Sequence, residues 1–583
     1  MSFTDKKKDA KVAESIYSTD VAEIHTVSSG SKTGGWFRRN FIDGFKPPAD
    51  NSEFADLTAT ERAHLFLNRT EPKLSRRHLM VIALAAYAGT GLFIGSGTSL
   101  KVAGPAALMI GFGVLGLAII CTICCLGEMG LRYPTVNVCY ELPARFLHPS
   151  VGFAIGYIYF MAACVSAPTE TIALTELIQF WSEDDNAGTR ANPAAWAALM
   201  WGLDVIIQLA GSRLYGEIEF IVGLIKVSGV AGFIIFSVIN VCGGPPTGHY
   251  IGAHNFHDPG AFLHSFKGVV QTLVSCSFAY GGAELIGIAA AETSNPIRSI
   301  PSGVRQTFWR IAILFLLSIF MVCLMVPADT PGLGNSSTGS GSPFVIALEL
   351  TGVKALPSIF NSVLMCSVFG VSNSCLYTAA RTLTSLSLKG VAPRCFCYID
   401  RNGRPLVSIA SVLAFMLIGF VVASDKGNDV FNWLYAFASL GYLYAWAGLT
   451  LSYIRYRYCM MLQKGSLSEL VWKSPLGMAG AIFGFAVMIG TLGLQFWVYL
   501  FPIGSDPDPQ VFFQNELSVP FFIILAVGHK LWKRKEAVFV SNRELDLDSG
   551  MRDFNIDDLK EIVRRDKEKA RKNFFHFIST YIC

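Results

Sequence analysis

Four glycines interrupt the first long apolar stretch of the chain. Gly89, Gly91, Gly95 and Gly97 fall inside an apolar run that begins at Met80. A run of that length predicts a membrane-spanning helix, yet a glycine in a helix interior costs about 1 kcal/mol relative to alanine. Broken backbone at membrane depth is tolerated only where it is buried in protein or lines a cavity. The stretch therefore indicates either a binding site, in which freed backbone N–H groups hold an anionic group, or a close helix–helix contact.

The composition indicates a polytopic membrane protein. Of the 583 residues, 52% are hydrophobic and 15% are charged, whereas a soluble protein carries about 25% charged residues. The 14 cysteines have the spacing of neither a metal site nor a disulfide framework. We find no phosphate-binding loop with a lysine and no nucleophile–base motif. The sequence thus predicts no enzyme, no metal, no cofactor and no nucleic-acid partner.

Twelve apolar stretches are long enough to cross a bilayer, so the predicted fold is all-α with twelve transmembrane helices. They lie at residues 79–100, 104–127, 150–181, 194–212, 217–242, 267–291, 307–327, 355–386, 406–424, 429–454, 477–501 and 517–532. This divides the chain into an N-terminal tail (1–74, largely disordered), a transmembrane domain (75–532) and a C-terminal tail (533–583). Arginine and lysine gather in the loops on the side of the tails, and the positive-inside rule therefore predicts that both termini are cytoplasmic.

The sixth stretch is interrupted in the same way as the first. Gly281 and Gly282 fall in the middle of it. The first and sixth stretches are five apart, which two inverted repeats of five helices would produce. Matching breaks favour the binding-site interpretation over simple packing.

The two breaks together predict a cradle for a zwitterion. Backbone amides of the first break would face a carboxylate, at Gly89, Thr90 and Gly91. Backbone carbonyls of the second break would accept from an ammonium, at Phe278, Ala279 and Tyr280. This pairing follows from the positive and negative ends of broken helices.

Ionisable residues inside the spans are costly and are functional by default. Lys226 is about nine residues into the fifth stretch, roughly 13 Å deep, where a lysine can gain and lose a proton; the alternative is a permanently ion-paired structural lysine. Glu170 and Glu284 are also deep. Each fits a proton carrier, a partner of a substrate amine, or a structural acceptor for a broken helix. Glu217 and Glu219 lie nearer the cytoplasmic end, where gate or packing roles are expected.

Polar and aromatic groups of the eighth and tenth stretches complete the candidate pocket. Asn373 and Ala438 are candidate substrate-binding positions. Tyr442, Tyr444 and Trp446 offer aromatic groups, although most aromatics in spans are core or lipid-facing.

The chain resembles the fungal amino-acid permeases of the amino acid–polyamine–organocation superfamily. The similarity covers about residues 70 to 500 in order. Its motifs are Ser75-Arg76-Arg77-His78-Leu79, the glycine-rich stretch 89–97, Gly104-Pro105-Ala106, Gly127-Glu128-Met129, Gly216-Glu217-Ile218-Glu219-Phe220, Ala291-Glu292-Thr293, Ser342-Pro343-Phe344, Lys389-Gly390-Val391-Ala392-Pro393-Arg394 and Ile454-Arg455-Tyr456-Arg457.

The resemblance implies a fold like that of the bacterial leucine transporter, with a five-plus-five inverted repeat and two further helices. It implies proton-coupled uptake of amino acids across the plasma membrane by alternating access. Lys226 would be linked to the proton, and Glu170 matches a third-span acid of such permeases. Glu284 is, from its depth in the sixth stretch, a further candidate for proton coupling. The tails would contact membrane lipid and the ubiquitin and endocytic machinery, and the terminal Cys583 would be palmitoylated.

Departures from the family pattern keep two alternatives open. Tyr87 and Ala88 replace the small residues usual before the first break, and Gly281-Gly282-Ala283-Glu284 stands where Gly-Thr-Glu is usual. The first alternative is an amino-acid sensor with little flux. The second is a permease for cationic amines or polyamines on the same fold.

Overall fold

The computed structural model describes residues 88–133, 137–181, 192–284 (except 247 and 249), 296–334, 341–533 (except 401, 425, 468, 469, 471, 504 and 505), 541–549 and 551. This part of the chain is helical throughout, with turns between the helices. The helices are α6 (Thr90–Phe93), α7 (Gly95–Ala103), α8 (Pro105–Arg132), α9 (Val138–Phe146), α10 (Pro149–Gln179), α11 (Pro193–Ala210), α12 (Ser212–Val241), α13 (Ser265–Tyr280), α15 (Pro296–Trp309), α16 (Ser318–Met325), α17 (Pro343–Glu349), α18 (Ala355–Leu388), α19 (Leu406–Met416), α20 (Gly427–Lys464), α21 (Gly477–Leu500), α22 (Pro509–Glu516) and α23 (Ser518–Trp532). A π-helix, η4 (Arg310–Leu317), joins α15 to α16, and η3 (His254–Phe256), η5 (Arg394–Cys397) and η6 (Leu417–Ala423) are 3₁₀ helices.

Within the described residues, nine helices are long and apolar enough to cross a membrane, or ten if the bent pair of α22 and α23 forms one span. These ten correspond to ten of the twelve predicted stretches. The two others are the first and the sixth, which are the stretches predicted to be broken. The described residues of the first begin only at Ala88, and those of the sixth end at Glu284.

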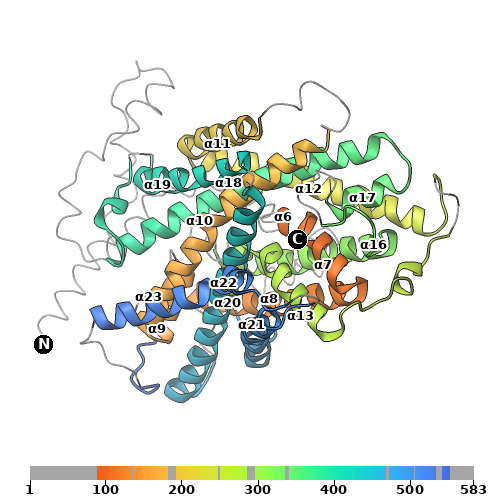
Figure 1. Cartoon of the computed structure of the whole chain (residues 1–583). Helices are drawn as coiled ribbons and strands as arrows, with labels where there is room; N and C mark the ends of the chain where they lie inside the picture. Colours follow the sequence, from red (N-terminus) through yellow and green to blue (C-terminus); the bar gives the residue numbers. More distant parts are fainter. Residues whose placement is uncertain are drawn as a thin grey trace, which may run out of the picture.

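Both predicted breaks are present. In the first stretch, residues 88 and 89 are not helical, α6 lasts for four residues, and Ile94 separates it from α7. In the sixth, α13 ends at Tyr280 and a turn follows, in which Gly282 has a φ of 72°. A positive φ of this size strains residues with a side chain, so Gly282 permits the turn. Figure 1 shows the short helices α6 and α7 beside α13, among the long helices.

Helix starts follow from local sequence signals. Proline stands in the first turn of α8, α10 and α11, where its missing N–H has no helical partner to lose. Gly104, with a φ of 87°, provides the sharp turn from α7 into α8. Asn192 caps α11 because its side-chain oxygen accepts from the amide of Ala194.

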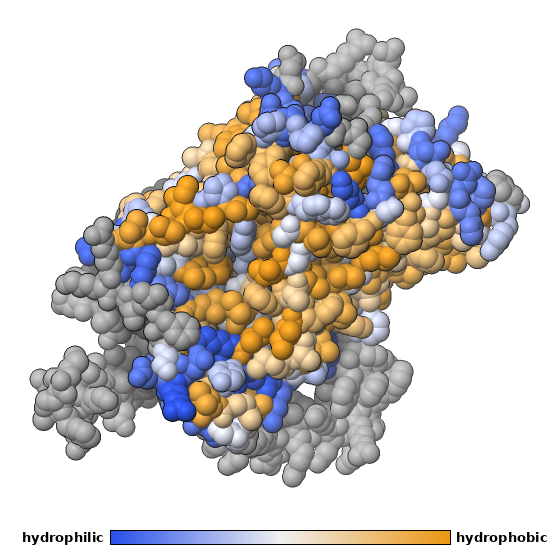
Figure 2. All heavy atoms as spheres, turned by 60° about the horizontal axis from the view of Figure 1, so that its bottom comes forward, coloured by the Kyte–Doolittle hydropathy of each residue, from blue (hydrophilic) through white to orange (hydrophobic). Residues whose placement is uncertain are grey.

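The outer surface carries a broad apolar belt. Figure 2 shows an orange face between two blue regions. Large aliphatic side chains on several spans are well exposed, among them Ile206 of α11, Ile235 of α12, Ile359 of α18 and Ile524 of α23. Exposed apolar area on this scale needs a lipid environment rather than water. The protein is therefore a multi-pass membrane protein.

The structure also contains elements that the sequence analysis did not predict. Helix α9 lies between the second and third spans and α17 precedes the eighth. In addition, residues 541–549 of the C-terminal tail dock against the ends of the spans. The Tyr133 hydroxyl donates to the carbonyl of Leu547 (2.9 Å), Arg145 donates to the carbonyl of Ser549 (2.7 Å), and Leu547 is buried.

Candidate functional site

The two broken helices touch at Gly91 and Ala279. A Cβ added to Gly91 would lie 2.5 Å from the backbone nitrogen of Ala279 and 2.6 Å from its Cα. Contacts that short do not occur, so only glycine allows the two backbones to approach this closely. The glycines of the first break thus have both of the roles that the sequence suggested. They interrupt the helix, and Gly91 lets it pack closely against α13.

Glu170 lies on the first break. It is fully buried on α10, and its Oε2 accepts from the Thr90 hydroxyl (2.6 Å) and from the Thr90 amide (3.4 Å). One amide of the predicted anion cradle is therefore already engaged by a carboxylate of the protein. Its second oxygen, Oε1, is buried and has no hydrogen-bond partner among the described residues. Of the three roles that the sequence left open for Glu170, that of an acceptor for the broken helix is realised in this structure.

Helix α20 covers the second break. Tyr442 lies over Gly281, because a Cβ there would be 2.8 Å from the Tyr442 ring. Trp446 stacks on Tyr442 with ring centroids 5.9 Å apart and donates from Nε1 to Glu284 Oε2 (2.8 Å). Glu284 therefore also accepts at a break. Tyr444 instead stacks on Phe522 of α23, away from the site.

Tyr435 connects the two broken helices and was missed by the sequence analysis. Its ring stacks on Phe278 of α13, with centroids 4.4 Å apart, and its hydroxyl donates to the carbonyl of Ser275 (3.0 Å). The same hydroxyl lies 2.5 Å from the Cβ position of Gly95 in α7. Tyr435 lies seven residues before Tyr442, so both rings are on one face of α20. This spacing is the sequence signal that could have identified Tyr435.

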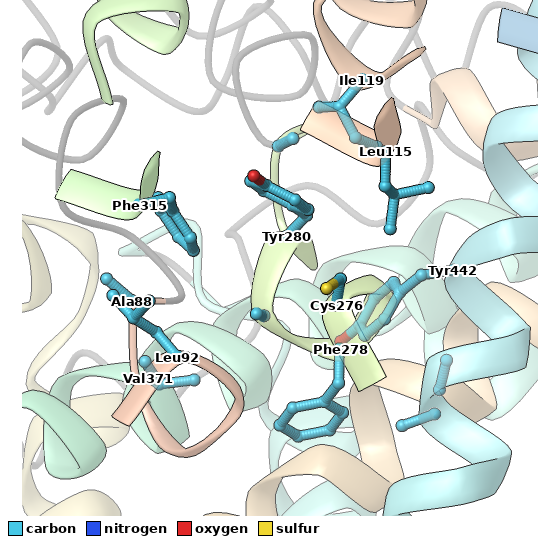
Figure 3. Close-up of a cluster of buried hydrophobic side chains, with 14 of the residues drawn as sticks. Ala88, Leu92, Leu115, Ile119, Cys276, Phe278, Tyr280, Phe315, Val371 and Tyr442 are labelled. Carbon is cyan, nitrogen blue, oxygen red and sulfur yellow. The ribbon is translucent and has the colours of Figure 1, made fainter. Parts of the chain in front are cut away.

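The predicted carbonyl side of the cradle is at the end of α13. The last four carbonyls of a helix have no partner within it. The Phe278 carbonyl accepts from the amide of Gly281 (3.1 Å). The side chain of Tyr280 points toward α8, where its hydroxyl donates to the carbonyl of Phe112 (2.8 Å). Figure 3 shows Tyr280 between Phe315 and Leu115, and Ala88 and Leu92 beside Val371.

Lys226 is paired with Glu219 on α12. Both are buried, and Lys226 Nζ lies 3.9 Å from Glu219 Oε1. Helix α12 begins at Ser212, so Glu219 lies nearer to that end of the helix than Lys226, and it is fully buried there. The spacing of seven residues places the two side chains on one face of the helix, and that pattern could have revealed the pair.

Helix α18 links this pair to the first break. The Cβ position of Gly370 lies 3.3 Å from Lys226 Nζ and 3.2 Å from Glu219 Oε2. The next residue, Val371, lies 2.7 Å from the Cβ position of Gly89. Glu170 Oε2 lies 3.2 Å from the same Cβ position of Gly89. Two consecutive residues of α18, Gly370 and Val371, therefore separate the buried ion pair from the first break.

Asn373 lies on another side of the core, whereas Ala438 lies beside α13. Asn373 Oδ1 accepts from Gln208 Nε2 of α11 (2.8 Å), and its neighbour Ser372 donates to Asp204 on the same helix (2.9 Å). Ala438 is buried on α20, and the carbonyl of the next residue, Ser439, accepts from the Ser277 hydroxyl of α13 (3.0 Å). The structure thus brings the two breaks, Glu170 and Lys226 together, and places Asn373 on the α11 side of α18. Asp204, a fully buried acid, was not anticipated.

Several candidates lie outside the described residues. These are the terminal Cys583, the N-terminal tail, Tyr87 and most of the C-terminal tail. In the part of the chain that is described, no group of three or more histidine, cysteine, aspartate or glutamate side chains is arranged to hold a metal ion.

Broken spans that meet beside buried charges, within a multi-pass helical bundle, define a membrane transporter. A family model described as amino acid permease matches residues 78–542, and the chain belongs to this family. It is a transporter rather than an enzyme, and membership implies the fold of the amino acid–polyamine–organocation superfamily.

Curated relatives match over nearly their whole length. The general amino-acid permease GAP1 of Saccharomyces cerevisiae is 38% identical over 570 residues, covering 96% of this chain and 93% of the relative. The general amino-acid permease GAP2 of Candida albicans is 39% identical over 535 residues, 90% of each chain. The S-adenosylmethionine permease GAP4 of Candida albicans is 36% identical over 558 residues, covering 94% and 90%.

Proposed function

We propose that this permease is a proton-coupled symporter that carries amino acids across the plasma membrane into the cell, with both termini in the cytoplasm. The observation that carries the proposal is the contact of the two broken helices at Gly91 and Ala279, with Glu170 on Thr90. In this position Glu170 is the protein's own anion at donors that suit a substrate carboxylate. We infer that substrate binding replaces or rearranges the contact between Glu170 and Thr90.

The packing of the spans supports an inverted repeat. In four of the five pairs, spans five apart in the sequence lie against each other: α7 and α13, α8 and η4, α10 and α18, and α11 and α19. A two-fold relation between the halves would pair these spans. On this basis the five-plus-five arrangement with two further helices is the architecture that we propose.

Alternating access follows from the same geometry. The substrate would bridge α6 and α13, with its carboxylate toward Gly89, Thr90 and Gly91 and its ammonium toward the carbonyls that end α13. Proton binding at Lys226 or at a buried acid would stabilise the outward, substrate-competent state. Removal of that proton would change the charge of the Lys226–Glu219 pair, which α18 joins to the break. One set of helices then rocks against the rest.

The test is uptake in cells that lack their own permeases. A labelled mixture of L-amino acids is offered at two pH values, with and without an uncoupler, and each of the twenty amino acids competes in turn. Two further competitors are added: spermidine, and S-adenosylmethionine, the compound in the name of one relative. We expect saturable uptake that is faster at acid external pH, abolished by the uncoupler and inhibited by a subset of the amino acids.

Two other outcomes would replace the proposal. Inhibition by spermidine but by no amino acid would favour a carrier of cationic amines. Surface expression with substrate binding and no flux would favour a sensor.

A further inference from the structure

A water-sized cavity lies at one end of the α12–α18 interface. It has a volume of about 20 Å³ and lies among the ends of α11, α12 and α18 and the loop Gly403–Pro405, which is enough for one water molecule. Tyr215, Tyr377 and Arg381 are among the residues that line it. By the positive-inside rule, this arginine-bearing end faces the cytoplasm.

Tyr215 reaches from this cavity into the interface. Its ring stacks flat on Tyr377, with centroids 4.2 Å apart, and the Arg381 guanidinium lies 4.3 Å from the centre of the Tyr377 ring. Its hydroxyl lies 3.1 Å from the Ser374 hydroxyl on α18. Both hydroxyls can donate and accept at once, as a proton relay requires.

The next layer of the same interface holds the buried ion pair. Glu219 is four residues beyond Tyr215 on α12, and Gly370 is four residues before Ser374 on α18, so the two layers are about 6 Å apart along the helices. The Cβ position of Gly370 lies 3.2 Å from Glu219 Oε2 and 3.3 Å from Lys226 Nζ. Neither carboxylate oxygen of Glu219 accepts a hydrogen bond from any described residue, although the side chain is completely buried.

We propose that Glu219 accepts the proton that Lys226 releases, and that the hydroxyls of Tyr215 and Ser374 pass it to water in the cytoplasmic cavity. In the first step the ammonium becomes an amine and the carboxylate becomes a carboxylic acid. In the second step the carboxylic acid of Glu219 passes its proton through the two hydroxyls to water, and the carboxylate is restored. This inference rests on the proposed proton coupling. It adds the path by which the proton leaves Lys226 and reaches the water.

The charged surroundings of Glu219 are compatible with this role. Lys226 is the cation that faces it from its own helix, and Glu170 of α10 lies beyond Lys226. From α18, Cys366 and Cys375 are the titratable side chains near Lys226, and Arg381 lies over Tyr377, the ring that stacks on Tyr215. Asp204 of α11 hydrogen-bonds to Ser372 instead. The acid nearest to Lys226 in the direction of the cavity is therefore Glu219.

The test separates net transport from exchange in proteoliposomes that contain the full chain. The probe is a ¹⁴C-labelled mixture of L-amino acids. Accumulation is driven by an acid exterior, and exchange is measured with vesicles loaded with the unlabelled mixture at equal pH. Exchange requires the substrate site and the rocking motion but no net release of a proton.

We expect Glu219→Gln to reduce accumulation by about 100-fold, the effect of losing a positioned proton acceptor, while exchange stays at the wild-type rate. Tyr215→Phe keeps the ring stack and Ser374→Ala keeps the helix, so each should slow accumulation and spare exchange. Thr384→Val is the matched control, because this buried α18 hydroxyl donates to the Ala380 carbonyl (2.9 Å) and to the Ser408 hydroxyl (2.8 Å) and takes no part in the proposed route. It should leave both rates unchanged.

Two results would overturn the route. The first is wild-type accumulation by Glu219→Gln. The second is an equal loss of exchange and accumulation in both Glu219→Gln and Tyr215→Phe, which would give the pair a packing role. Wild-type vesicles that accumulate substrate without a proton gradient would instead refute the proposed coupling itself, so the two failures are distinguishable.

Discussion

Replacing Gly91 by alanine should block transport by separating the two broken helices. The added methyl group would lie 2.5 Å from the backbone nitrogen of Ala279, whereas ordinary contacts begin at 3.4 Å. The helices must therefore part by about 1 Å, because backbone atoms cannot turn aside as a side chain would. Overpacking of this kind costs about 1–3 kcal/mol. If this strain acts on the state in which the two broken helices touch, and that state is the one needed for transport, its population decreases by about 5- to 150-fold.

The assay is the initial rate of labelled amino-acid uptake per surface copy, together with the melting temperature of the purified protein. Gly113→Ala is the matched control: this glycine is inside α8, and no heavy atom lies within 4 Å of its Cβ position. The control should transport at the wild-type rate. A Gly91→Ala protein that also transports at that rate would show that the backbone contact with Ala279 is not needed.

Three further predictions concern charged groups. Lys226→Met should abolish concentrative uptake while surface labelling stays normal, since it removes the cation of the buried pair; concentrative uptake by this variant would exclude Lys226 from coupling. Arg457→Ala should lower the free energy of unfolding by about 3–5 kcal/mol, and with it the melting temperature, because Glu128 would stay buried without its 2.7 Å ion pair. Arg457→Lys should recover part of this stability. An unchanged melting temperature of Arg457→Ala would contradict the argument. The pKa of Asp546 in the docked tail is lowered chiefly by a hydrogen bond from the Ser549 hydroxyl. A lowered pKa favours the docked state above the ordinary value of 3.8 and weakens it only as the pH falls through the lowered value. Protease protection of residues 541–549 should therefore persist from pH 7 to pH 4 and be weaker in Asp546→Asn; loss of protection already at pH 5 would contradict it.

The features that the sequence predicted well have local causes. Gly89, Gly91, Gly281 and Gly282 interrupt apolar runs, and a helix interrupted by paired glycines needs no tertiary information to be recognised. The depth of Lys226 and Glu170 followed from counting residues along a helix. These signals gave the two breaks and most of the acids and bases beside them.

What the sequence did not predict depends on tertiary packing. The seven-residue spacing puts Glu219 and Lys226 on one face of α12, but the burial of that face against Gly370 of α18 is a tertiary contact. Tyr435 resembles any other aromatic residue of a span until its ring is seen on Phe278. Helices α9 and α17 are short, and Pro143 within α9 argues against a helix at that position.

The occupation of Thr90 by Glu170 could not have been deduced either. The sequence offered three roles for this acid, and only the register between α10 and the first break distinguishes them.

The central claim is that amino-acid movement through this site is tied to proton movement. The most direct measurement uses wild-type proteoliposomes with equal pH on both sides and a pH-sensitive dye inside. An inward gradient of L-amino acids alone is then applied. The account predicts that the lumen becomes acidic as the amino acids enter, and that Lys226→Met removes this signal. Amino-acid entry at an unchanged luminal pH would contradict it.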